Sequence, residues 1–105
     1  SATSRTQIFK TFQETPDPWV LVIQPQAAAH GVTLTAANTV VWWGPTSSLE
    51  TYSQANARVH RSGQKHKCTV VQLHGSPVEK RVYTLLDNRI DVHTKIIDLY
   101  KEILD

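Results

Sequence analysis

The sequence predicts an α/β fold with a mostly parallel sheet flanked by helices, and two observations support this prediction. Short apolar runs rich in β-branched residues occur at residues 19–23, 39–43 and 68–73, and each has the length of a strand. Segments with apolar residues at helical spacing precede the first run, separate the last two and follow the third. Strands that alternate with helices are typical of a parallel sheet covered by helices. The 105 residues suit one small domain.

The N-terminal segment predicts a short amphipathic helix, because its apolar residues have helical spacing and the prolines at positions 16 and 18 would end it. These apolar residues are Ile8, Phe9 and Phe12. The run WVLVI at 19–23 predicts a strand buried on both faces. The small and polar residues at 26–39 predict a loop.

A second helix is expected after the strand at 39–43. Ser47 or Ser48 would cap its N-terminus, with the helix beginning near Leu49. The helix should continue to about Arg61, where a glycine two residues later would stop it.

The C-terminal region predicts further helix. The third strand, at 68–73, is followed by a Gly-Ser-Pro turn at 75–77 that supplies a cap and a first-turn proline. Apolar residues recur at helical spacing over 77–104, which predicts two helices or one bent helix.

Composition narrows the class of protein. Eleven Lys and Arg against nine Asp and Glu give a net charge of +2, which is too small to predict nucleic-acid binding by itself. Cys68 is the single cysteine, so no disulfide forms within the chain, in keeping with an intracellular setting. No apolar run approaches the length of a membrane span, so no membrane partner is expected. The chain contains no methionine, and we expect a fragment of a longer protein.

Two segments have residue patterns with a chemical meaning: HGVTLTAANTV at 30–40 and QANARVHRSGQ at 54–64. They resemble motifs V and VI of the SNF2 (Swi2/Snf2) family in helicase superfamily 2, which read roughly G-x-x-L-T-A-A-N-x-V and Q-A-x-x-R-x-x-R-x-G-Q. Between them, SLETYSQ at 48–54 resembles the bacterial and phage branch of that family. VEKRV at 78–82 resembles the T-V-E-E-R-V segment that follows the last core strand.

The resemblance implies that residues 1–105 are a single partial domain, the C-terminal part of the second lobe of a helicase-like motor. Its fold would be an incomplete RecA-like (P-loop NTPase-like) lobe. The intact protein would be a DNA-dependent ATPase that translocates on DNA. The chain contains neither a G-x-x-x-x-G-K-[ST] loop nor a D-E-x-[HD] box. ATP and Mg²⁺ would therefore be bound mainly by a first lobe upstream in the same protein, and the isolated chain is expected to be inactive.

Arg58 and Arg61 are the candidate catalytic residues. They are three positions apart, so they are expected to share one helical face. A planar, permanently charged guanidinium suits the γ-phosphate. The resemblance assigns Arg61 as the arginine finger and Arg58 as its partner, with Gln54 and Gln64 as further nucleotide-binding residues. The alternative is a solvated helix face.

The loop before the second strand is the candidate DNA-binding segment. His30, Gly31, Thr33 and Thr35 follow a predicted strand, at the edge where α/β sheets bind ligands. Glycine lets the backbone approach a phosphate closely, and threonine supplies donors without base specificity. The resemblance implies contact with the DNA backbone. The same residues are also compatible with a plain turn in which Thr35 caps the chain.

Other chemical interpretations are weaker. His60, His66 and Cys68 match no common zinc spacing and lack a fourth ligand, so no metal site is expected. Trp42 and Trp43 could stack on bases, but adjacent strand residues face opposite sides, so at least one should lie in the core. We expect that both do. Two functions compete with the motor: a non-catalytic nucleic-acid-binding module that retains the fold, and a scaffold that docks proteins through its C-terminal helices.

Overall fold

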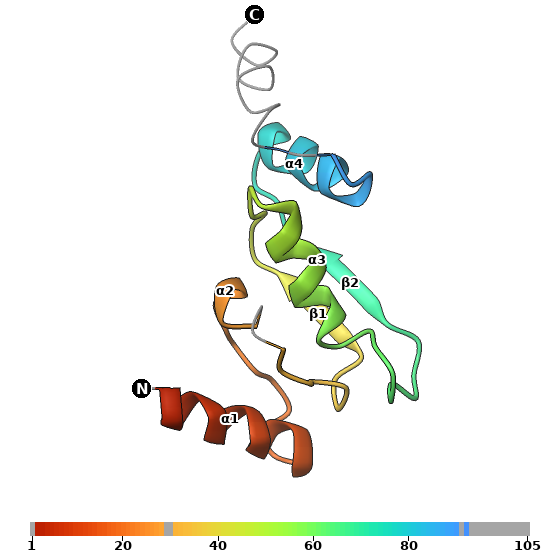
Figure 1. The fold of residues 1–105 in the computed structure, drawn as a ribbon. Coiled ribbons are helices and arrows are strands. Elements are labelled where there is room, and N and C mark those ends of the chain that lie inside the picture. Colours follow the sequence, from red (N-terminus) through yellow and green to blue (C-terminus); the bar gives the residue numbers. More distant parts are fainter. Residues whose placement is uncertain (1, 29–30, 91, 93–105) are drawn as a thin grey trace, which may run out of the picture.

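The computed structural model of the chain describes residues 2–28, 31–90 and 92 (Figure 1). Along the sequence the elements are α1 (Ala2–Glu14), α2 (Pro25–Ala28), β1 (Thr39–Trp42), α3 (Leu49–Ala57), β2 (Thr69–Gln72) and α4 (Pro77–Asp87). Helix α2 was not predicted. None of the helices within the described ranges is long and apolar enough to cross a membrane.

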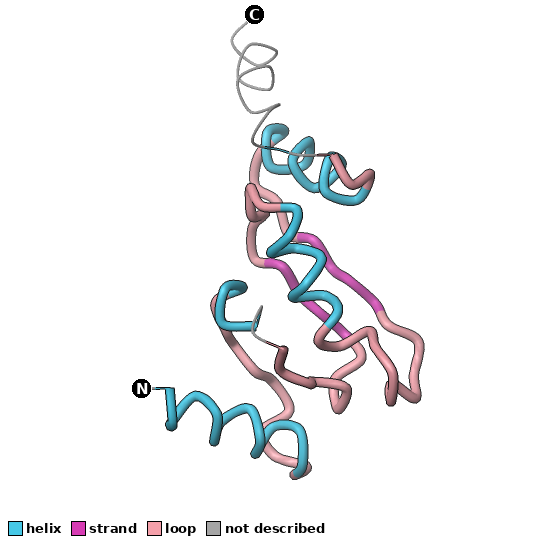
Figure 2. The backbone as a smooth tube through the Cα atoms, in the orientation of Figure 1, coloured by secondary structure: helices cyan, strands magenta, loops and turns pink. Residues whose placement is uncertain are grey.

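The sheet confirms the predicted α/β class. β1 and β2 pair in parallel, from Thr39 opposite Thr69 to Trp42 opposite Gln72. Helix α3 connects the two strands and lies over them (Figure 2). One face of β1 is covered, because Trp42 is buried, while the other is open, because Val41 is 57% exposed. The strand predicted at 39–43 is therefore present as β1, and only one of its faces is buried.

The prediction of a buried strand at 19–23 was also wrong. The segment forms no strand, and the sheet of the described residues contains only β1 and β2. Leu21 and Ile23 are half-buried, whereas Trp19 and Val22 are each 89% exposed. An apolar run becomes a strand only where a neighbouring strand accepts its backbone hydrogen bonds, and none does so here.

Helix α3 begins where the sequence predicts and ends early. The Ser48 hydroxyl caps it by accepting the Thr51 N–H at 3.1 Å. At the other end the N–H groups of Arg58 and Val59 bond to carbonyl oxygens three residues back, which tightens the last turn. The helix ends at Ala57 rather than near Arg61. Arg58 and Arg61 therefore do not share a helical face.

Helix α4 confirms its predicted start. The Ser76 hydroxyl accepts the Glu79 N–H, and Pro77 occupies the first turn, where its missing N–H has no intrahelical partner to lose. The helix ends at Asp87. Residues 88–89 form a turn, and the part of the predicted helical region at 91 and 93–104 lies outside the described residues.

Two apolar clusters form the core. The α3–α4 cluster consists of Trp42, Tyr52, Val82, Tyr83, Leu86 and Val92. The α1–loop cluster consists of Phe9, Phe12, Leu34 and Val59. Trp42 is confirmed as a core residue, with its ring tilted against Tyr52 and its Nε1 donating to Asn56 at 2.8 Å. Trp43 is 87% exposed, so the prediction that both tryptophans are buried was wrong, because neighbouring strand residues face opposite sides.

Candidate functional site

The loop at residues 31–37 precedes β1 and lies beside the end of α3 (Figure 2). Its backbone bonds directly to that helix end, since the Leu34 N–H donates to the Arg58 carbonyl at 2.8 Å. Gly31 has a φ of +82°, a conformation that glycine adopts without strain. The two motif-like segments of the sequence are therefore in direct contact.

Arg58 lies against the start of this loop. It is the C-cap of α3 and half-buried, and its Nε donates to the Gln54 carbonyl at 3.0 Å. A Cβ at Gly31 would lie 4.0 Å from Arg58 Nη1, so the guanidinium is beside the glycine backbone. The end of α3 thus places the Arg58 guanidinium next to the loop.

Arg61 reaches the same loop from the turn after α3. The residue is exposed, and its Nη1 donates to the Val32 carbonyl at 3.3 Å. Although the two arginines share no helical face, the structure brings them together at residues 31–32. Within the described part of the chain, both guanidinium groups bond to backbone carbonyls and neither meets a carboxylate. No carboxylate among the described residues therefore neutralises their positive charges.

The two glutamines predicted to bind nucleotide have different surroundings. Gln54 is one turn before Arg58, and its amide donates to the Glu50 carboxylate at 3.1 Å. Gln64 braces the loop: its Nε2 donates to the carbonyls of Ala37 at 2.6 Å and Val59 at 2.9 Å. The Gln64 amide is thus fully engaged with backbone, because its Oε1 also accepts the His66 N–H. A nucleotide contact by Gln64 stays a prediction, and it would require these bonds to break.

The structure describes three of the four residues that were predicted to contact DNA. Gly31 and Thr33 are exposed on the loop, and Thr35 is half-buried in a turn. His30 lies outside the described residues. Sequence reasoning missed Gln13, whose side chain bonds to the loop at Thr35. A polar residue on an amphipathic helix has no periodicity that would distinguish it from a solvated position.

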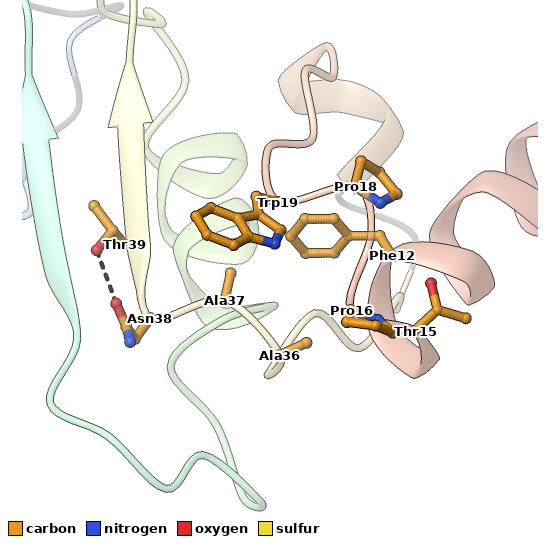
Figure 3. Close-up of a pocket in the computed structure, with 9 residues that line it drawn as sticks. All are labelled: Phe12, Thr15, Pro16, Pro18, Trp19, Ala36, Ala37, Asn38 and Thr39. Atoms are coloured by element: carbon orange, nitrogen blue, oxygen red, sulfur yellow. Dashed lines mark hydrogen bonds between the residues drawn. The ribbon is translucent and has the colours of Figure 1, made fainter.

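Two open hollows flank the loop. One, of about 400 Å³, lies between the end of α1 and the loop, where Trp19 and Phe12 project into it (Figure 3). The other, of about 410 Å³, lies along α1 and is lined by residues that include Lys10, Gln13 and Thr33. The described part of the site therefore presents donors and cations along an open surface rather than in an enclosed pocket.

Comparison with known proteins identifies the family. Residues 1–63 match the model of the helicase conserved C-terminal domain. The C-terminal part of the Fun30 ATPase domain has the same fold, with a TM-score of 0.71 over 82% of this chain and 28% of that chain, at 23% identity.

Named relatives share substantial sequence. The chain is 40% identical over 68% of its length to the chromatin-remodeling ATPase INO80 of Emericella nidulans, and 30% identical over 89% to INO80 of Cryptococcus neoformans. It is 35% identical over 95% to the bifunctional helicase and thymine dioxygenase JBP2 of Leishmania tarentolae. The chain spans 4%, 5% and 8% of these three proteins.

The relatives bear on the branch as well as on the family. All three organisms are eukaryotes, so the comparisons do not support the bacterial or phage branch that SLETYSQ at 48–54 indicates. The matched family model spans both the loop at 31–37 and the two arginines after α3. The chain belongs to the helicase conserved C-terminal domain family, in the form found in SNF2-family ATPases.

Proposed function

We propose that the chain is part of the second motor lobe of a DNA-dependent, SNF2-type ATPase that moves along DNA. The observation that carries the proposal is the convergence of Arg58 and Arg61 on residues 31–32, with no carboxylate partner among the described residues. Uncompensated guanidinium groups suit polyphosphate, because each binds phosphate oxygens in pairs and stays charged at all working pH values.

Arg61 is the proposed arginine finger. It is exposed and held by one long hydrogen bond to a carbonyl, so it can leave that position at small cost. Arg58 is half-buried and bonded to the end of α3, so its guanidinium is held in place. This suits a partner of Arg61 that binds the same phosphate. Gln54 would orient water or the facing lobe from the turn before.

In this proposal ATP, bound together with Mg²⁺, is the substrate that is hydrolysed. The described residues offer two cations for phosphate but no group of three acidic, histidine or cysteine side chains for a metal. We therefore assign the binding of Mg²⁺ and most of the ATP to an upstream first lobe, and the charge-stabilising arginines to this lobe. The protein would act inside the cell, where both ATP and DNA are present.

The DNA-binding part of the proposal assigns the loop at 31–37 to the sugar-phosphate backbone. Gly31 and Thr33 are exposed there, and Thr33 and Lys10 both line the hollow along α1. Hydroxyl, amide and ammonium donors recognise phosphate without reading the base sequence. We include His30 in this set because it directly precedes Gly31 in the sequence.

The test is ATP hydrolysis by the intact protein that contains this chain, with and without duplex DNA, for wild type and Arg61→Ala. We expect DNA to stimulate hydrolysis and the substitution to lower the stimulated rate about 10³- to 10⁵-fold. Lys80→Ala, an exposed cation on α4, is the charge-matched control and should leave the rate unchanged.

Two results would overturn the proposal. If the intact protein hydrolyses no ATP but binds DNA, the non-catalytic binding module becomes the better interpretation. If DNA stimulates hydrolysis and Arg61→Ala behaves as Lys80→Ala does, Arg61 is a surface residue and not the finger. DNA binding and the thermal midpoint of each variant, measured alongside, separate a lost finger from a lost fold.

A further inference from the structure

The side chain of Gln13 joins α1 to the loop at residues 31–37 through two hydrogen bonds. Its Nε2 donates to the Thr35 hydroxyl at 2.9 Å, and its Oε1 accepts the Ala36 N–H at 2.8 Å. Both lengths are those of well-formed hydrogen bonds. Gln13 is 22 residues from Thr35 in sequence, so this is a long-range tertiary connection.

The donor direction of the first bond has a consequence for Thr35. A threonine hydroxyl has one hydrogen to donate and two lone pairs that accept. Because Gln13 uses a lone pair, the hydroxyl hydrogen stays available for an acceptor outside this pair. The second bond satisfies the Ala36 N–H, so that group is not a free phosphate donor. One side chain thus decides which donors the loop presents.

Gln13 also lines the hollow in which the loop meets α1. This hollow of about 410 Å³ contains Thr33 on the loop side and Lys10 on the helix side. The distance between those two residues depends on how closely the loop lies against α1. The amide of Gln13 fixes that spacing through Thr35 and Ala36, two and three residues after Thr33.

We propose that Gln13 is a positioning residue for DNA. It holds the loop against α1 so that the Thr35 hydroxyl, Thr33 and Lys10 face the sugar-phosphate backbone together. Gln13 itself touches no phosphate in this arrangement; it acts through Thr35. This inference rests on the proposed function of the loop.

A purely structural role for Gln13 makes different predictions. The apolar packing of the α1–loop cluster comes from Phe9, Phe12, Leu34 and Val59, none of which depends on the Gln13 amide. If the amide only stabilised the fold, its loss would lower the thermal midpoint and the maximal rate together. If it positions the loop, its loss raises the DNA concentration required and spares the rate at saturating DNA.

The experiment measures DNA-stimulated ATP hydrolysis by the intact protein against duplex DNA concentration. Gln13→Met keeps the length of the side chain and removes both hydrogen bonds. We expect about a tenfold rise in the DNA concentration for half-maximal stimulation, since two neutral hydrogen bonds are lost. Gln7→Met, on the same helix, removes only a long exposed bond to Thr11 and is the matched control.

Thr35 supplies the second pair of variants. Thr35→Val removes the hydroxyl and should raise the required DNA concentration about as much as Gln13→Met, while Thr35→Ser retains the hydroxyl and should stay near wild type. The double variant Gln13→Met, Thr35→Val should be less harmful than the sum of the two single effects, because both substitutions remove the same bond between Gln13 and Thr35. Lys10→Gln should flatten the salt dependence of DNA binding by about one charge, whereas Gln13→Met should not.

The outcomes are distinguishable. A wild-type protein whose hydrolysis ignores DNA overturns the proposed function and this inference with it. A wild-type protein that responds to DNA, with Gln13→Met matching Gln7→Met, overturns the inference alone. If Gln13→Met lowers the thermal midpoint more than its control, the comparison of Thr35→Val with Thr35→Ser decides: equal behaviour of these two contradicts the positioning role.

Discussion

The α3–α4 cluster and the α1–loop cluster differ in what keeps their parts in place. In the first, aromatic and aliphatic side chains from β1, α3 and α4 are buried against one another, and the Tyr83 hydroxyl contacts the carbonyls of Trp42 and Leu73 at the ends of the strands. In the second, a few apolar residues are supplemented by polar side chains that bond to loop backbone. Those polar contacts come from Gln13, Gln64 and Arg61.

We infer from this difference that the α3–α4 cluster is rigid and that the loop beside the α1–loop cluster can change its position more easily. Packed apolar side chains fix a position through many small contacts, which do not rearrange singly. Side-chain bonds to a loop can exchange for bonds to a ligand at little net cost, because each contributes only about 1 kcal/mol. The arginines and the loop thus lie at the end of the domain that can change shape, and three predictions test this division.

The largest expected effect is on the α3–α4 cluster. Leu86 is 2% exposed, so Leu86→Ala should lower the free energy of unfolding by about 2–5 kcal/mol through lost burial and a residual cavity. Urea unfolding of the chain measures this loss. Val22→Ala, at a position that is 89% exposed, makes a similar truncation and should change stability by less than about 0.5 kcal/mol.

Amide hydrogen exchange on the Leu86→Ala variant tests the division directly. The amides of α4 should exchange faster, because they open through global unfolding, while those of Leu34 and Ala36 should change little, because they open locally. Equal acceleration at both ends would show that the chain is one cooperative unit with no adjustable end.

An intermediate effect is expected at Gln64. Gln64→Met removes three hydrogen bonds and leaves the carbonyls of Ala37 and Val59 without that donor, at a cost of about 1–3 kcal/mol. The Leu34 amide should lose protection from exchange while the α4 amides keep theirs. Gln24→Met is the control, since Gln24 is exposed. Loss of α4 protection in the Gln64 variant would contradict the separation of the two clusters.

Sequence patterns predicted the parts of the fold that depend on neighbouring residues. The caps at Ser48 and Ser76 are local, because a hydroxyl bonds to an N–H three residues later. The residue at which α3 ends depends on a distant contact: the Arg58 carbonyl accepts the Leu34 N–H of the loop in place of an intrahelical N–H. The failed strand at 19–23 likewise depends on a distant partner.

The candidate site shows the same limit. Arg58, Arg61 and the loop at 31–37 were found because their order along the chain forms a motif, and the structure brings them together. The hydrogen bonds by which Gln13 and Gln64 hold the loop could not be predicted. In a sequence, a glutamine that bonds to distant backbone looks the same as a solvated one. Only the geometry separates the two cases.

The smallest expected effect is an alkaline weakening confined to the α3–α4 cluster. Burial raises the pKa of the Tyr83 phenol above its ordinary value of 10.0, and the Glu79 carboxylate adds to this. Burial also raises the pKa of Tyr52, which donates to Asp87 at 3.0 Å; the amide of Gln72 opposes the rise. A phenol that ionises less readily in the folded state adds stability below the unfolded pKa, and this stability is lost as pH rises through the folded pKa.

The free energy of unfolding should therefore begin to fall near the ordinary phenol pKa of 10.0 and continue to fall until the pH exceeds the raised pKa of Tyr83. The informative quantity is the difference in stability between wild type and Tyr83→Phe, because this difference isolates the contribution of one phenol. The variant should be less stable at neutral pH, because the hydroxyl contacts to Trp42 and Leu73 are gone, but its stability should fall less steeply above pH 10. Parallel pH curves for the two proteins would mean that Tyr83 ionises as readily in the folded chain as in the unfolded one. In that case the buried phenol would not distinguish the packed end of the domain from the end that carries the arginines.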